Sequence, residues 1–221
     1  MQRTNESVYD GVVVFPKAAP TPTGAESGIK LDLDDPGWGW RDLTGVIQPK
    51  ASGAGSPTRQ IYAGGQLADY AFALNDVCDI NFHTPHDHVP GTDMFVHVHW
   101  SHTGTAISGT AEFTVYHSYS RGHNQANFPA EKSVVITVPT PNIATIPRYR
   151  HRVDEVALTS AGGSASLLDN ALIEVDGLHL TTIKLTQLPV ITGGNLFIHT
   201  VDIHYQSSNL ATKQKSPNFY I

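Results

Sequence analysis

Histidine is the side chain whose number and spacing in this sequence most directly suggest chemistry. Six of the twelve histidines lie between His83 and His102. Imidazole is the commonest protein ligand for transition metals, and it titrates nearest to neutral pH. From Gln60 to Ser120 the chain has six acidic residues and no lysine or arginine. We therefore expect this segment to hold a cation, to repeat around a symmetry axis, or to form an aromatic hydrogen-bonding layer.

Two of these histidines have the spacing of a metal site on a strand. His97 and His99 are two residues apart in an alternating segment, so both rings leave the same face. Together with Gly91 they match the opening of the cupin metal motif, but no carboxylate follows within five residues of His99. His102 and His88 are the further candidate ligands for a divalent transition metal. The alternatives without metal are a histidine face that hydrogen-bonds to polar neighbours and a proton-dependent switch.

The elements that carry these side chains are predicted to be strands. Alternating or β-branched segments bounded by turn residues recur from about residue 60 onward. They comprise residues 79–83, 93–101, 110–120, 133–138, 150–159, 172–175, 178–185 and 195–206. No segment has a convincing helical period with caps. The pattern predicts an all-β protein with a jelly-roll-like β-sandwich, an extended N-terminal arm and a C-terminal tail.

The chain is predicted to have three parts. Residues 1–58 form an extended arm and linker, residues 59–206 the sandwich core, and residues 207–221 a polar tail with an aromatic end. Two extensions around one body favour a protein that interlocks with neighbouring chains. The residues expected at such interfaces are the arm tryptophans, an alternating basic stripe and the aromatic end of the tail: Trp38, Trp40, Arg148, Arg150, Arg152, Phe219 and Tyr220.

Composition narrows the function further. The charged fraction is only 15%, and the formal net charge of −6 argues against a nucleic-acid-binding surface. The single Cys78 forbids an internal disulfide and is expected to be a small buried residue. No signal peptide is expected, and no stretch is apolar for the roughly 20 residues of a membrane span. Because no nucleophile elbow, P-loop or dinucleotide motif is present, we expect no enzyme.

One segment resembles a known group of proteins. Residues 91–100, GTDMFVHVHW, are similar to the Gly-Thr-Asp-x-x-x-His-x-His-Trp signature of a group of tailed-bacteriophage virion proteins. Residues 201–206 resemble the closing strand of that group, and residues 37–43 and 212–220 also fit it. The resemblance implies a structural, β-rich particle component without assigned enzymatic activity. Its position as a head decoration protein, a fibre base or a tail accessory protein stays open.

This resemblance sets the expected partners and location. We expect a homo-oligomer, in the first place a trimer, that contacts other virion proteins such as the major capsid or tail proteins. It would be made in the host cytoplasm and reside in the virion, without a nucleic-acid or membrane partner. Two alternatives remain: a cupin-like metal-dependent enzyme using the His97 and His99 strand, and a carbohydrate-binding β-sandwich. The latter needs an exposed aromatic platform, for which the available tryptophans are Trp38, Trp40 and Trp100.

Overall fold

The computed structural model describes residues 7–9, 12–14, 38–212 and 214–219. It divides the chain into two units, Met1–Trp38 and Gly39–Ile221. In the first unit, β1 (Ser7–Tyr9) pairs antiparallel with β2 (Val12–Val14).

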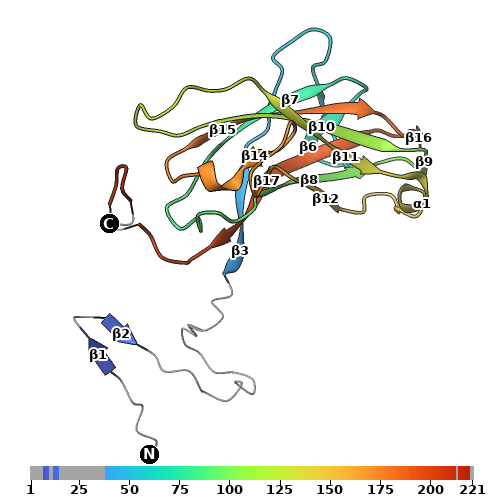
Figure 1. Cartoon of the computed structure of the whole chain (residues 1–221). Coiled ribbons are helices and arrows are strands. Elements are labelled where there is room, and N and C mark those ends of the chain that lie inside the picture. The colour runs from blue at the N-terminus through green and yellow to red at the C-terminus, as the bar shows by residue number, and fades with distance from the viewer. Residues whose placement is uncertain (1–6, 10–11, 15–37, 213, 220–221) are drawn as a thin grey trace, which may run out of the picture. The chain divides into compact units, whose positions relative to one another are not determined.

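The regular secondary structure of the second unit is almost entirely β-strand, as Figure 1 shows. The helix α1 (Thr140–Ile143) and the 3-10 turn η1 (Asn170–Leu172) are short interruptions. The described part of the chain contains no helix that is both long and apolar enough to span a membrane. The strands are β3 (Gly39–Gly45), β4 (Gln48–Pro49), β5 (Thr58–Ile61), β6 (Ala68–Phe72), β7 (Val77–His83), β8 (Phe95–His102), β9 (Ala106–Ser108), β10 (Ala111–Ser120), β11 (Lys132–Val138), β12 (Arg152–Ala157), β13 (Thr159–Ser160), β14 (Leu168–Asp169), β15 (Leu178–Gln187), β16 (Val190–Thr192) and β17 (Leu196–Ser207).

The strand order is that of a jelly roll. One sheet has the order β11-β10-β15-β7-β4 and the other β12-β8-β17-β6-β5, with β3 also paired to β17. Along the chain the main strands are β6, β7, β8, β10, β11, β12, β15 and β17. The first of them pairs with the last, the second with the seventh, the third with the sixth and the fourth with the fifth. A long antiparallel ribbon rolled into two layers gives this nested order. The prediction of an all-β, jelly-roll-like sandwich is confirmed.

Alternation along the central strands separates an apolar core from a polar outer face. In β8, Val96, Val98 and Trp100 are fully buried between the sheets. His97 and His99 lie between them in sequence and therefore project from the opposite face. The prediction that these two histidines share one face of a strand is borne out by their register.

The segment of residues 39–58, expected as part of an arm, belongs to the sandwich instead. β3 pairs antiparallel with β17 from Val201 to Ser207, and β4 pairs with β7. A Cβ atom on Gly45 would collide with Ile80 and Phe82, so β3 passes close over β7 of the facing sheet at that point. The compact unit accordingly begins at Gly39 rather than at residue 59.

The aromatic end of the tail, predicted as an interface group, contacts its own chain instead. Phe219 is buried, and its ring packs against His86 and His123 of its own chain. Tyr220 lies outside the described residues.

The predicted basic stripe does not form. β12 begins only at Arg152, which forms an ion pair with Asp154. Arg148 and Arg150 lie in the preceding loop, where Tyr149 adopts a left-handed φ of 63° and breaks the alternation.

Besides His102, which is also buried, three histidines lie inside the sandwich. His88, His117 and His179 are each 1% exposed. Both ring nitrogens of His88, and Nδ1 of the other two, have no hydrogen-bond partner among the described residues. Burial lowers the pKa of His88 to about 4 and that of His179 to about 3, and it also lowers the pKa of His117. The interior therefore holds these imidazoles in their neutral form at neutral pH.

The two units predict a sharp boundary for truncation. Deleting residues 1–38 should preserve a cooperative thermal transition, because every strand of the sandwich lies downstream. Extending the deletion to residue 50 removes β3 and β4 and should lower the melting temperature markedly. Circular dichroism melts of both truncated proteins check this. Equal melting temperatures would contradict the assignment of β3 to the sandwich.

The buried histidines predict acid sensitivity. Because their folded-state pKa values lie below the unfolded value of about 6.5, the unfolded chain takes up protons first. Stability is therefore complete above about pH 6.5 and falls as the pH drops towards the folded values of about 4 and about 3. Replacing His88→Met removes one of these groups and should flatten the pH dependence of the unfolding free energy. Urea titrations between about pH 7 and pH 5 measure it, with His123→Gln as the exposed control. If His88→Met leaves the pH dependence of the unfolding free energy unchanged while His123→Gln flattens it, the prediction is wrong.

Candidate metal centre

The outer face of the β12, β8, β17 and β3 strands gathers histidines and carboxylates. In the ladder, His97 of β8 lies opposite Glu155 of β12 and Asp202 of β17. Asp42 of β3 lies opposite His204 of β17. Because directly opposed residues of antiparallel strands share a face, four strands bring these side chains to one surface.

Asp202 is the centre of this cluster. Its side chain is only 5% exposed, with Oδ1 3.1 Å from His97 Nδ1 and Oδ2 2.6 Å from His99 Nε2. Yet Asp202 Oδ1 and His99 Nε2 have no hydrogen bond of acceptable alignment among the described residues. The ligand atoms of His97, His99 and Asp202 all lie within 4.8 Å of one another, which is close enough for one cation to bind all three. Around a tetrahedral zinc ion, such atoms lie about 3.3 Å apart.

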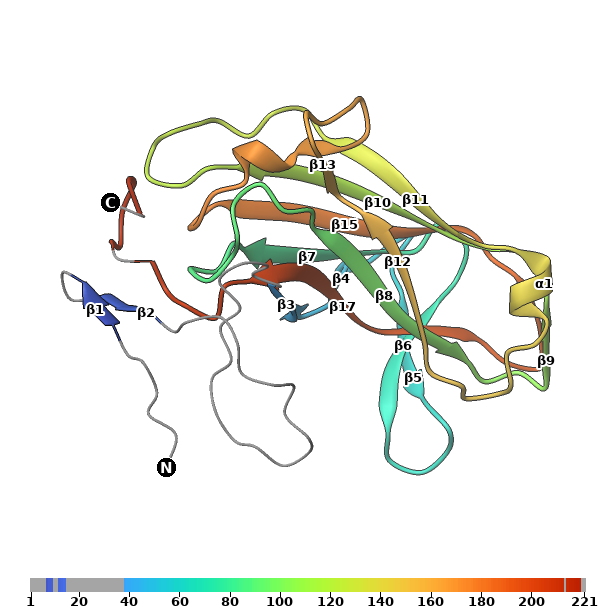
Figure 2. The same cartoon turned by 60° about the horizontal axis from the view of Figure 1, so that its bottom comes forward.

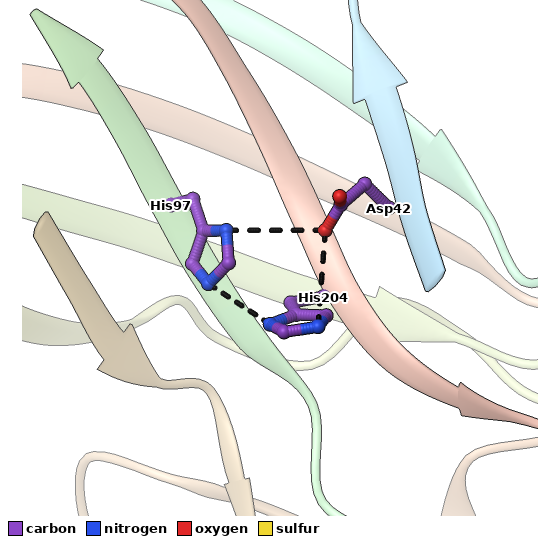
Figure 3. Close-up of side chains that lie close together, drawn as sticks. All are labelled: Asp42, His97 and His204. Atoms are coloured by element: carbon purple, nitrogen blue, oxygen red, sulfur yellow. Dashed lines mark hydrogen bonds and ion pairs between the residues drawn. The ribbon is translucent and has the colours of Figure 1, made fainter. Parts of the chain in front are cut away.

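A second group adjoins the first through His97. Figure 3 shows Asp42, His97 and His204 facing one another from three strands. His97 Nε2 is 3.1 Å from His204 Nδ1, whereas Asp42 Oδ1 is 3.9 Å from each of the two rings. Asp42 is largely exposed, with 58% of its side chain accessible. The group around Asp202 is therefore the better shielded of the two.

The carboxylates of this face have histidines as their charged partners. The ion pairs described for Asp202, Glu155 and Asp42 all involve imidazoles and no lysine or arginine. A buried carboxylate without a permanent positive partner is costly. A divalent cation between Asp202 and the two imidazoles would remove that cost.

Neighbouring side chains hold the imidazole rings of His97 and His99 in place through their second ring nitrogens. His151 Nε2 lies 2.9 Å from His99 Nδ1, and the two rings stack at 5.1 Å. Glu155 Oε2 lies 2.9 Å from His97 Nε2. Contacts to the second ring nitrogen orient a ligating histidine and raise its basicity. Both histidines can therefore present one nitrogen to Asp202 while the other is held.

The two arm tryptophans are described and remain partly exposed. Trp40 packs its ring 4.6 Å from His204 and 5.8 Å from Phe95, at the edge of the cluster. It is still 47% exposed, and Trp38 is 41% exposed. Their predicted role in contacts with a neighbouring chain stays a prediction.

Two of the predicted ligands do not reach the site. His102 lies three residues after His99, so it faces the interior, where Nε2 is 3.0 Å from the carbonyl oxygen of Ile146. His88 is buried between the sheets. Sequence reasoning missed Asp202 and His204 on the partner strand. The signal was present, because their two-residue spacing in the last strand repeats that of His97 and His99.

Cys78 and the surface hollow described for this chain do not add metal ligands. Cys78 is fully buried, and burial raises the pKa of its thiol to about 12, so it is neither a thiolate ligand nor a nucleophile. A surface hollow of about 380 Å3 on the other side of the molecule is lined by Tyr119, Lys132 and Leu172, among others, and contains no histidine.

Comparisons with known proteins were made for the sequence and for the fold. No protein-family model matches the chain, and no curated protein matches it. Among solved structures, a similar one is that of TmCBM61, a carbohydrate-binding module, in complex with β-1,4-galactotriose. The two chains are 10% identical with a TM-score of 0.27, over 76% of this chain and 88% of that one.

Proposed function

We propose that this chain is a structural component of a tailed-bacteriophage particle and that its outer sheet face binds one divalent transition-metal ion. The observation that carries the metal assignment is the buried Asp202 carboxylate, unaligned for hydrogen bonding, between His97 and His99. Two imidazole nitrogens and one carboxylate oxygen suit zinc or a similar ion. Because the three ligands join β8 to β17, the ion would clamp the middle of the sheet.

The particle role draws on different observations. Residues 91–100 carry the resemblance to tailed-bacteriophage virion proteins, and the same segment supplies β8 and its two histidines. Jelly rolls are common among viral capsid proteins, so the architecture is compatible with this role. A capsid decoration or head-tail accessory protein that contacts itself and the major capsid or tail proteins is the proposed identity. The exposed Trp38 and Trp40 are its proposed contact residues.

The positions of the histidines and tryptophans argue against the two alternative functions, a cupin-like enzyme and a carbohydrate-binding β-sandwich. A cupin-like enzyme requires His97 and His99 inside the sandwich, whereas they lie on its outer face. A carbohydrate-binding platform of three tryptophans loses Trp100, which is fully buried. A structural role agrees with both placements.

Metal binding is the first test of this proposal. Purified protein stripped with chelator should take up about one equivalent of Zn2+, and its melting temperature should rise, because the ion binds only the folded state. Replacing His97→Gln together with His99→Gln, or Asp202→Asn alone, should weaken binding by roughly a hundredfold or more. His123→Gln, a partly exposed histidine outside the cluster, is the matched control. Isothermal titration and metal analysis measure the effect.

The outcome that contradicts the metal site is equally specific. Stoichiometric binding that survives the double substitution but disappears in His123→Gln would place the ion elsewhere. Absence of any binding by folded protein would refute the site while leaving the particle role to its own test.

Self-assembly tests the particle role. Light scattering at micromolar concentration should give a trimer, three times the 23.9 kDa of one chain. Trp40→Ala and deletion of residues 1–38 should each shift the equilibrium towards monomer, because burial of apolar surface on a neighbour contributes about 25 cal/mol per Å2. A monodisperse monomer at all concentrations would contradict the proposed assembly.

A further inference from the structure

A second polar cluster lies at the other end of the same sheet face. Ser101 is in β8, His199 in β17, Asp69 in β6, and Tyr62 directly follows β5. These four strands are consecutive neighbours in the order β8-β17-β6-β5. The metal centre uses none of the four side chains.

The hydrogen bonds among them form one directed chain. Ser101 Oγ lies 2.8 Å from His199 Nε2, and His199 Nδ1 lies 2.6 Å from Asp69 Oδ2. Because an ionised carboxylate only accepts, Nδ1 carries the ring proton and Nε2 is the acceptor. The Ser101 hydroxyl therefore donates to His199, and its oxygen accepts from Tyr62, whose hydroxyl is 2.8 Å away.

A β-bulge places the histidine in this chain. The β17–β8 register pairs Ile198 with Trp100 and then Thr200 with His99, so His199 is the extra residue. Bulges re-aim side chains and are frequent beside active sites. Here the bulge directs His199 between a serine on one neighbouring strand and an aspartate on the other.

We propose that Ser101, His199 and Asp69 form a nucleophile–base–carboxylate triad that hydrolyses carboxylic esters. A serine within hydrogen-bond reach of Nε2, with Nδ1 bound to a carboxylate, is the geometry that defines such triads on unrelated folds. The activity goes beyond the structural role and does not depend on the metal ion.

The reaction balances with water as the second reactant. Ser101 Oγ bonds to the acyl carbon as its proton moves to His199 Nε2. The bond from that carbon to the alkoxy oxygen then breaks, and the departing oxygen takes the proton from His199, which yields the alcohol. Water, deprotonated by His199, attacks the acyl–serine ester and releases the carboxylic acid. The proton returns to Ser101, and no oxidation or reduction takes place.

The geometry also identifies the group that would stabilise the developing oxyanion. Ser101 pairs with Phe197 in the sheet ladder, so its backbone is engaged in strand pairing. The hydroxyl of Tyr62 already donates to Ser101 Oγ and is the side-chain donor within reach of an oxygen on the attacked carbon. A preorganised side-chain donor of this kind serves as an oxyanion hole.

Access to the nucleophile is controlled by the same tyrosine. Ser101 is fully buried, and the Tyr62 ring packs edge-on at 5.2 Å from Phe197 and 5.0 Å from His199. The hairpin between β5 and β6 follows at once, as Figure 2 shows, with three residues of positive φ from Ala63 to Gly65. The residues before and after Tyr62 in the sequence, Ile61 and Ala63, are exposed. Tyr62 is therefore the side chain whose removal tests access to Ser101.

The test uses a fluorophosphonate probe, which bonds covalently to activated serine oxygens and releases fluoride. Full-length protein is labelled in the presence of chelator, and the modified residue is mapped by mass spectrometry. Hydrolysis of p-nitrophenyl acetate is followed in parallel. The variants are Ser101→Ala, His199→Gln, Asp69→Asn and Tyr62→Gly, with Ser118→Ala as the control serine. Circular dichroism establishes that each variant is folded.

The expected result is labelling at Ser101 in wild-type protein. Where the Tyr62 ring keeps the probe out, labelling is expected in Tyr62→Gly, at a rate lowered by the loss of the hydroxyl donor. His199→Gln should slow labelling by roughly a hundredfold or more, since that is the scale of general-base assistance. Ser118→Ala should change nothing. Failure to label Ser101 in both wild type and Tyr62→Gly overturns the proposal. So does ester hydrolysis that persists in folded Ser101→Ala, or a labelling rate unaffected by His199→Gln. Because the mapped site is read on wild-type and Tyr62→Gly protein, the test survives misfolding of the other variants.

Discussion

The pairing of β8 with β17 is the interaction on which the rest of this structure depends. The two strands lie side by side in the middle of one sheet, and each contributes to the core and to the outer face. Their inward residues, such as Val98 and Val201, are fully buried. Their outward residues supply the ligands of the proposed metal centre. The same ladder that closes the hydrophobic core therefore sets the spacing of the polar groups on its reverse side.

The charges on that reverse side are the physical reason for proposing a cation there. Asp202 is almost completely removed from water, and the groups beside it are imidazoles rather than lysine or arginine. An imidazole offers hydrogen bonds but no permanent positive charge, so the desolvation cost of the carboxylate is only partly offset. In the proposed metal centre, a divalent ion would supply the missing charge, and its ligands would be the ring nitrogens of His97 and His99 that lie nearest Asp202.

Sequence reasoning was strongest where a residue's neighbours along the chain decide its environment. Alternation predicted the β8 strand and placed His97 and His99 on one face, and the absence of helical periods predicted the all-β class. The same parity excludes His102 from that face, because it lies three residues beyond His99. Asp202 escaped prediction because its contact with His97 joins segments about a hundred residues apart. The arm boundary was missed for the same reason, since β3 is a strand only through its pairing with β17.

The bulge at His199 determines which side chains of β17 face the core and which face outward. Before it, β17 buries Leu196 and Ile198, which are even-numbered, and after it the strand buries Val201 and Ile203, which are odd-numbered. Without the extra residue, strict alternation would turn Asp202 into the core and Val201 out to solvent, since a slip by one position exchanges the two faces. The bulge thus keeps an apolar interior along the whole strand and at the same time aligns Asp202 with His97. It also turns His199 itself towards Ser101. Both polar clusters on this face, and the unbroken core beneath them, follow from that single inserted residue.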